Sequence, residues 1–148
     1  EMQALAAQLP EYPVVMAMHG VGDSLGPQLM AELGDVARFT HRNAITAFAG
    51  VDPGADQSGT HEAKSTRVSK SGPPELRRAL FLVMDCLLKT QPQDDPVYRF
   101  MDKKRAEGKP YLVYMTAGAN KFLRIYYARA KECMANLDAS AEDSETAE

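Results

Sequence analysis

Cysteine is scarce in this sequence, and long apolar runs are missing. Cys86 and Cys133 are the only cysteines, and they lie far apart in helical-looking sequence, which excludes a disulfide framework and a CxxC metal site. No run of about 18 apolar residues occurs, and no charged-then-apolar segment opens the chain, which argues against a membrane span or a secretory signal. The sequence therefore predicts a soluble protein of the reducing cytoplasm that has no membrane partner.

Histidine is also rare, and its placement excludes two common kinds of active site. His19, His41 and His61 lack the spacing of metal ligands, and none of them lies beside a serine and an aspartate in a readable catalytic triad. We therefore expect no metal ion or other cofactor to be bound by this chain alone.

The chain has enough apolar residues for one ordinary domain. It holds 148 residues, of which 45% are apolar, and this is sufficient to bury a sizeable core. Its first residues already have helical character, so we expect a piece of a longer protein. We expect the folded domain to occupy residues 1–138 and residues 139–148 to form a disordered acidic tail, because that end is too poor in apolar residues to pack.

Positive charge is concentrated in two stretches, although the net charge is −3. The last ten residues hold four carboxylates and no basic residue, and without them the 17 basic residues face 16 acidic ones. Residues 64–78 hold five basic residues against Glu75, and residues 103–131 hold eight against Glu107. Such stretches are typical of a surface that binds a phosphate backbone, although many enzymes carry similar solvated faces.

The hydrophobic pattern predicts a mainly α protein with one long polar loop. Apolar residues recur at helical spacing in several segments, and glycine and proline separate them. Thr40 is the expected N-cap of one short helix, and Gly34 is the expected C-cap of the helix before it. Residues 50–74 have little periodic hydrophobicity, so we expect a long, mobile loop there. The expected helices are a short lead-in before Pro10 and the segments 24–33, 40–48, 74–89, 97–107 and 110 into the 130s.

A glycine hairpin near the start of the chain is the first candidate nucleic-acid contact. Gly20 and Gly22 precede a helix, which resembles a helix-hairpin-helix element, where glycine lets backbone N–H groups approach a phosphate. The alternative is a tight helical turn that binds nothing.

The polar loop carries the second candidate site. Ser58 is followed by Gly59, so a phosphate could approach the hydroxyl closely, while Lys70, Arg77 and Arg78 could stabilise charge on its oxygens. Alternatively, these side chains are solvated turn and surface groups. A third set, the aromatic residues Phe122, Tyr126 and Tyr127, lies among basic residues and fits either stacking on bases or a helix core.

The order of several motifs resembles the C-terminal transposase domain of the insertion-sequence one-ten family, also called one-sixteen or nine-oh-two. The resemblance covers roughly residues 12 to 131. The motifs that carry it are His19–Asp23 (HGVGD), Ala31–Phe39 (AELGDVARF), Ala47–Pro53 (AFAGVDP), Gln57–Gly59 (QSG), Ser69–Gly72 (SKSG), Leu76–Leu80 (LRRAL), Gly108–Lys109 and Asn120–Ile125 (NKFLRI).

The resemblance implies a DNA recombinase of two domains. An N-terminal RNase-H-like domain would bind Mg²⁺ through an acidic tetrad, and the domain with these motifs would supply a serine that attacks a DNA phosphate. A structured bridge RNA would pair with donor and target DNA, and the active enzyme would be a multimer. By its place in the QSG motif the serine would be Ser58, with Ser65, Ser69 and Ser71 as alternatives. Lys70, Arg77 and Arg78 would contact phosphates, and this chain without the acidic domain would bind DNA but not turn over.

Two other functions remain compatible with the sequence. One is a non-catalytic helix-hairpin-helix module that binds nucleic acid, in which Ser58 is only a turn residue. The other is a helical protein-interaction domain whose basic faces are merely solvated. Only the second of these predicts no salt-sensitive binding of DNA or RNA.

Overall fold

The computed structural model describes residues 2–52 and 72–146, and these fold into seven α-helices and one short 3₁₀ helix with no strand. This confirms the mainly α class. The elements are α1 (Met2–Ala6), α2 (Tyr12–Met16), α3 (Leu25–Leu33), η1 (Val36–Arg38), α4 (Arg42–Ala49), α6 (Pro74–Thr90), α7 (Pro96–Ala106) and α8 (Tyr111–Thr146).

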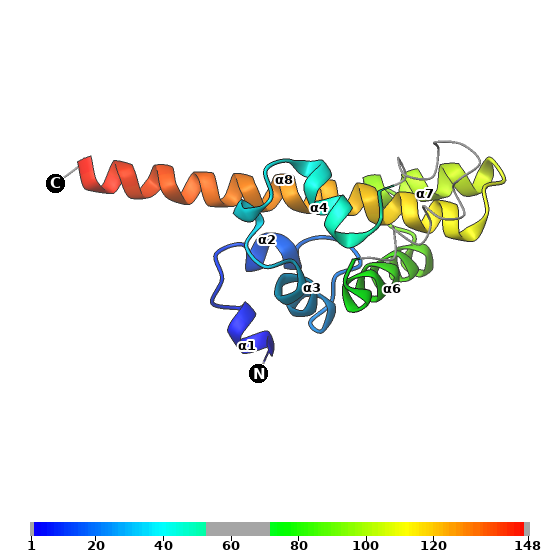
Figure 1. Ribbon diagram of the computed structural model, residues 1–148, viewed down its shortest axis with the longest axis horizontal. Coiled ribbons are helices and arrows are strands. Elements are labelled where there is room, and N and C mark those ends of the chain that lie inside the picture. The colour runs from blue at the N-terminus through cyan, green and yellow to red at the C-terminus, as the bar shows by residue number, and fades with distance from the viewer. Residues whose placement is uncertain (1, 53–71, 147–148) are drawn as a thin grey trace.

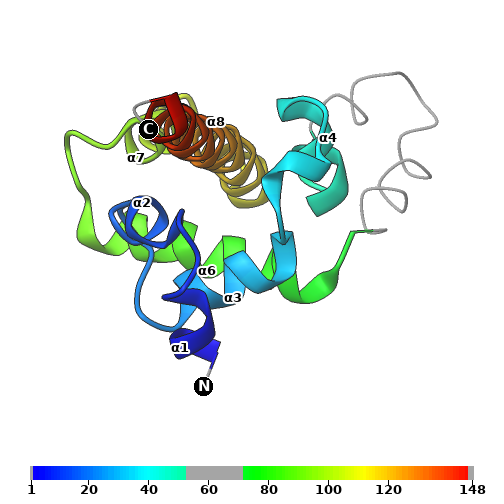
Figure 2. The same ribbon diagram turned by 90° about the vertical axis from the view of Figure 1, so that its left-hand side faces the viewer.

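Helix α8 is the axis of the domain. It has 36 residues and is therefore about 54 Å long. Helices α2, α4, α6 and α7 all contact it, and α3 packs against α6 (Figure 1). Viewed nearly along α8, α4 lies on one side while α3 and α6 lie below (Figure 2). The C-terminal part of α8 projects beyond the other helices.

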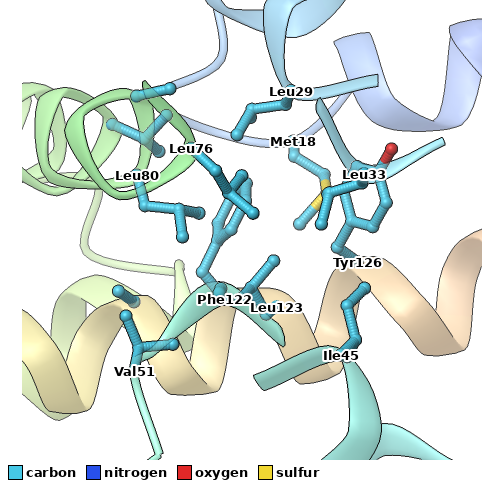
Figure 3. Packing of buried hydrophobic residues seen from close by; sticks show 14 of the residues in the cluster. Met18, Leu29, Leu33, Ile45, Val51, Leu76, Leu80, Phe122, Leu123 and Tyr126 are labelled. Carbon is cyan, nitrogen blue, oxygen red and sulfur yellow. The ribbon is translucent and has the colours of Figure 1, made fainter. Parts of the chain in front are cut away.

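The core lies where α3, α4 and α6 meet α8. Leu76 and Leu80 of α6 point toward Phe122 of α8, as expected for an α6 that is apolar nearly all round (Figure 3). Phe122 is among the largest fully buried side chains. The other labelled core residues are Met18, Leu29, Leu33, Ile45, Val51, Leu123 and Tyr126.

Local signals place most helix ends within a residue or two of the expected positions. Gly34 is the C-cap of α3, as predicted, and Asp95 caps α7 by accepting a hydrogen bond from the Tyr98 backbone N–H at 2.8 Å. The prediction that Thr40 caps α4 is wrong. His41 is the N-cap, and its Nδ1 accepts from the Asn43 N–H at 3.2 Å, because the chain is still extended at His41 and the helix begins one residue later.

The end of α8 differs from the disordered tail expected over residues 139–148. The helix continues to Thr146, and residues 139–146 are exposed along their whole length. Alanine and glutamate are good helix formers, so local propensity extends the helix where no packing partner does. The proposed division at residue 138 stays a prediction.

No helix of residues 2–52 and 72–146 combines the length and the apolar character that crossing a membrane requires.

Candidate nucleic-acid interface

The two ends of the polar loop are fixed to the helical core. Val51 follows α4, is almost fully buried, and its carbonyl accepts a hydrogen bond from the Asn120 side-chain amide at 3.0 Å. Asn120 lies on α8 and is only 6% exposed, so this bond forms in a dry environment between residues 69 positions apart. The outgoing end of the loop is therefore tied to the central helix.

Gly72 fixes the returning end. It is buried, and a Cβ atom built on it would lie 2.5 Å from the Phe48 carbonyl oxygen and 2.8 Å from the Ala49 carbonyl carbon. Only glycine lets the chain pass the end of α4 this closely. The expected mobile loop over residues 50–74 is thus anchored at Gly50–Asp52 and at Gly72. The rest of that prediction concerns residues 53–71, outside the described residues.

The candidate nucleophile lies between these anchors in sequence. Ser58, Gly59 and Lys70 belong to residues 53–71 and are outside the described part of the chain, as are the alternative serines 65, 69 and 71. Their assignment as site residues stays a prediction. Gly72 and Asn120 hold the two ends of the loop, a role that their places in the SKSG and NKFLRI motifs did not predict.

Arg77 and Arg78 are the fourth and fifth residues of α6, five and six residues after the Gly72 anchor. Arg78 is exposed, whereas Arg77 is half-buried and already has an interaction within the protein. Pro74 opens this helix at its first position, and Glu75 is the acidic residue of the first turn. A rigid helix start thus presents Arg78 to solvent close to where the loop returns.

The glycine hairpin packs against the core helix. Gly20 has φ +84°, and a Cβ there would lie 3.0 Å from the Val83 carbonyl oxygen and 3.1 Å from Leu87 Cγ of α6. This close approach explains Gly20 without any ligand. Gly22, in contrast, is exposed, and a Cβ added to it would meet no atom within 4 Å, so it stays the freer candidate for a phosphate contact.

The pair Gly20→Ala and Gly22→Ala separates a folding role from a DNA contact. We expect Gly20→Ala to lower the free energy of unfolding by about 1 to 3 kcal/mol, because alanine disfavours positive φ and meets α6. Gly22→Ala should change it by less than about 0.5 kcal/mol. Urea denaturation measures both changes. Unchanged affinity of Gly22→Ala for duplex DNA would contradict the predicted hairpin contact.

The aromatic residues of α8 belong to the core. Phe122, Tyr126 and Tyr127 are all buried, and the Tyr127 hydroxyl donates to the Phe39 carbonyl at 3.0 Å. Burial, together with the nearby Glu11 carboxylate, raises the pKa of the Tyr126 hydroxyl, so this phenol stays protonated at neutral pH. The core alternative is confirmed for these three side chains, and stacking on bases is excluded in this arrangement.

Metal-ligating side chains do not gather anywhere in residues 2–52 and 72–146. No group of three or more His, Cys, Asp or Glu side chains there is placed to hold a metal ion. His19 and Asp94 approach each other at 3.8 Å, but both side chains are largely exposed.

Comparison with known proteins identifies the family. The sequence matches the Transposase IS116/IS110/IS902 family over residues 12–99, which is more than half of the chain. The chain belongs to this family. The match spans the glycine hairpin, both loop anchors at Val51 and Gly72, the Ser58 motif and the start of α6.

Relatives are similar over most of this transposase-family domain. It is 26% identical over 132 residues to an insertion element IS110 protein of 43.6 kDa from Streptomyces coelicolor, covering 89% of the chain and 32% of that protein. It is 29% identical over 109 residues to the pilin gene-inverting protein of Moraxella bovis, and this match covers 74% of the chain and 33% of that protein. An insertion element IS900 protein of 42 kDa from Mycobacterium paratuberculosis is 28% identical over 120 residues, and this match covers 80% of the chain and 29% of that protein. The chain spans about a third of the length of these relatives.

Proposed function

We propose that this chain is the DNA-binding and strand-exchange domain of a transposase, and that Ser58 is its nucleophile. The family match over residues 12–99 carries the proposal, because it contains the QSG motif in order with the motifs around it. The names of the relatives, an insertion element and a gene-inverting protein, support DNA rearrangement as the reaction.

The anchoring of the loop supports a catalytic role for it. A nucleophile must be held within a few tenths of an ångström of its productive position, although the loop itself must admit a DNA strand. The Asn120 bond to Val51 and the close contact of Gly72 with α4 hold the two ends of such a loop on a rigid core. Arg78 is exposed near the start of α6, six residues after Gly72, and it could contact a phosphate.

The proposed reaction is a phosphoryl transfer that conserves phosphodiester bonds. The Ser58 hydroxyl loses its proton to a base, and its Oγ forms a bond to the phosphorus atom of one DNA strand. The bond from that phosphorus to a deoxyribose oxygen breaks, and the released oxygen takes up a proton. Attack by the hydroxyl of another strand end then reverses the step and joins new strands, so no external energy source is needed.

Other parts of the working complex are expected to come from outside this chain. A divalent cation would polarise the phosphate in such a reaction. We assign Mg²⁺ binding to an acidic RNase-H-like domain, which this chain would need in order to turn over. We further propose a bridge RNA that pairs with donor and target DNA, a homo-oligomer that shares sites between subunits, and action in the cytoplasm.

The test is detection of a covalent protein–DNA adduct on a denaturing gel. The reaction would contain labelled element-end DNA, the RNA, Mg²⁺ and the protein in which this domain is joined to the acidic domain. We expect the adduct to form with the unaltered protein and to be lost in Ser58→Ala. Ser65→Ala, Ser69→Ala and Ser71→Ala are matched controls and should retain it.

Each other outcome has a definite meaning. An adduct that survives Ser58→Ala and disappears in one of the control variants moves the nucleophile to that serine. If neither the unaltered protein nor any variant forms an adduct, although all of them bind DNA, the chain is a non-catalytic binding module.

A further inference from the structure

The beginning of α4 and the middle of α8 together form a groove with a strongly positive wall. It has a volume of about 840 Å³, and none of its lining residues is acidic. Arg42 comes from α4, and the other cations come from α8, about 80 residues later in the chain. The cationic residues of this basic groove are Arg42, Lys121, Arg124, Arg129 and Lys131.

Among residues 2–52 and 72–146, no ion pair neutralises the charges of the basic groove. The ion pairs of the described residues join His19 to Asp94, Lys89 to Asp85 and Arg105 to Asp102, and none of them involves a groove residue. The Arg124 Nε is buried without a hydrogen-bond partner among the described atoms, and Arg124 Nη2 reaches only the Asn43 side-chain oxygen, at 3.5 Å. The half-buried Arg124 guanidinium therefore keeps donor capacity beyond its one contact with Asn43.

The position of Arg42 is unfavourable for stability. It is the first residue of α4, and the first turn of this helix contains no acidic residue. A helix N-terminus carries partial positive charge and favours anions, so a cation there is held against the helix dipole. Arg42 therefore contributes to a field that attracts an anion rather than to the stability of α4.

Two lysines of the groove are held in place by aromatic rings. Lys121 Nζ lies 5.0 Å from the centre of the Phe100 ring, which Lys104 also approaches, at 4.9 Å. Lys131 Nζ lies 5.1 Å from the centre of the Tyr127 ring. Such cation–π contacts limit the freedom of long side chains, so less entropy is lost when they bind a ligand.

The shape and chemistry of the groove fit the backbone of a double helix. From Lys121 to Lys131 the cations extend about 15 Å along α8, and a duplex carries about one negative charge per 1.7 Å of its axis. The aromatic residue that lines the groove, Tyr127, is buried, so no exposed ring is present there on which single-stranded bases could stack.

We propose that the basic groove between α4 and α8 binds the phosphate backbone of duplex DNA without reading its sequence. The proposal rests on the proposed function only in its choice of DNA as the duplex. The lining residues of the groove lie at positions 40–42 and 121–131, and most of its cations lie on α8, beyond the 12–99 family match. It would hold the DNA while the loop acts on a scissile phosphate.

The test is fluorescence anisotropy with a labelled DNA duplex of about 30 base pairs, at salt concentrations from about 50 to 200 mM. The groove variant combines Arg42→Gln, Lys121→Gln and Arg124→Gln. The control combines Lys89→Gln, Lys103→Gln and Lys109→Gln, which remove the same charge elsewhere. We expect the groove variant to bind at least about tenfold more weakly and with a salt dependence smaller by roughly two to three ions, while the control keeps most of its affinity.

A second groove variant keeps the test decisive if the first variant does not fold. Arg129→Gln with Lys131→Gln replaces two exposed side chains of the same groove, and circular dichroism melting checks that each variant is folded. Equal DNA binding by the folded groove variants and the unaltered chain would overturn the proposal. So would equal losses in the control, tighter binding of an RNA hairpin than of the DNA duplex, or self-association of the chain through the groove in place of DNA binding.

The outcome of the groove test does not depend on which residue is the nucleophile. Ser58→Ala should bind the duplex with unchanged affinity, because it alters no groove residue. If the groove variants fail to weaken binding while Ser58→Ala abolishes the adduct, the groove is wrong and the proposed function stands. If the groove variants weaken binding while Ser58→Ala retains the adduct, the groove binds DNA and Ser58 is not the nucleophile.

Discussion

Replacing Phe122 with alanine should lower the free energy of unfolding by about 3 to 5 kcal/mol. Phe122 is 1% exposed and lies where Leu76 and Leu80 of α6 meet α8, so its removal leaves a cavity at the centre of the core. A loss of this size is a large part of the stability of an ordinary domain. Chemical denaturation monitored by circular dichroism measures it.

Tyr111→Ala is the matched control for Phe122→Ala. It truncates an aromatic residue of the same helix, but Tyr111 is 53% exposed near the start of α8, and we expect a change of less than about 1 kcal/mol. Had Phe122 been a platform for bases, its loss would weaken DNA binding and leave stability nearly unchanged. That result would contradict the buried arrangement.

Gly72→Ala should damage both stability and strand exchange. The added Cβ would lie 2.5 Å from the Phe48 carbonyl oxygen and 2.9 Å from that of Ala49. These neighbours are backbone atoms and cannot turn aside as a flexible side chain does, so the chain must shift at the returning end of the loop. We expect a loss of about 1 to 3 kcal/mol in the free energy of unfolding.

The effect of Gly72→Ala on the reaction should exceed its effect on folding. A shift of about 1 Å in a reacting group can cost about a hundredfold in rate, and residues 53–71 end next to this anchor. Adduct formation by the protein with its acidic domain is the measurement. Val97→Ala in α7 is the control. It should lower the free energy of unfolding by a comparable amount, about 1 to 3 kcal/mol, without altering the loop ends. Equal rates for the two variants would show that Gly72 serves folding alone.

Local signals in the sequence predicted most of the helices. Apolar residues at helical spacing predicted α6 and α7 to within a residue or two, because helix periodicity and proline at the first turn are written in neighbouring residues. The prediction that Thr40 is the N-cap of α4 was wrong, and the reason is also local. Two adjacent residues could cap α4, and only the backbone conformation at His41 decided between them.

Features that join distant residues could not be predicted in this way. The Asn120 bond to Val51 spans 69 positions, and no local pattern marks an asparagine within an apolar helix as the partner of a loop carbonyl. The same holds for Gly20, whose closeness to α6 depends on how two segments 63 residues apart pack. The sequence made Gly20 a candidate phosphate contact, with a tight turn as the alternative. The close approach to α6 accounts for a glycine at this position, and the phosphate contact stays a prediction.

The sequence by itself determined the helical class, the family and the QSG motif with Ser58, because these depend on the order and spacing of neighbouring residues. Only the tertiary structure decided that Phe122 is core, that Gly72 and Asn120 anchor the loop, and that Arg42 shares one groove with the cations of α8. The physical reason is that burial and charge density depend on which distant segments come together. A helix pattern specifies which face is apolar, but not which partner covers it.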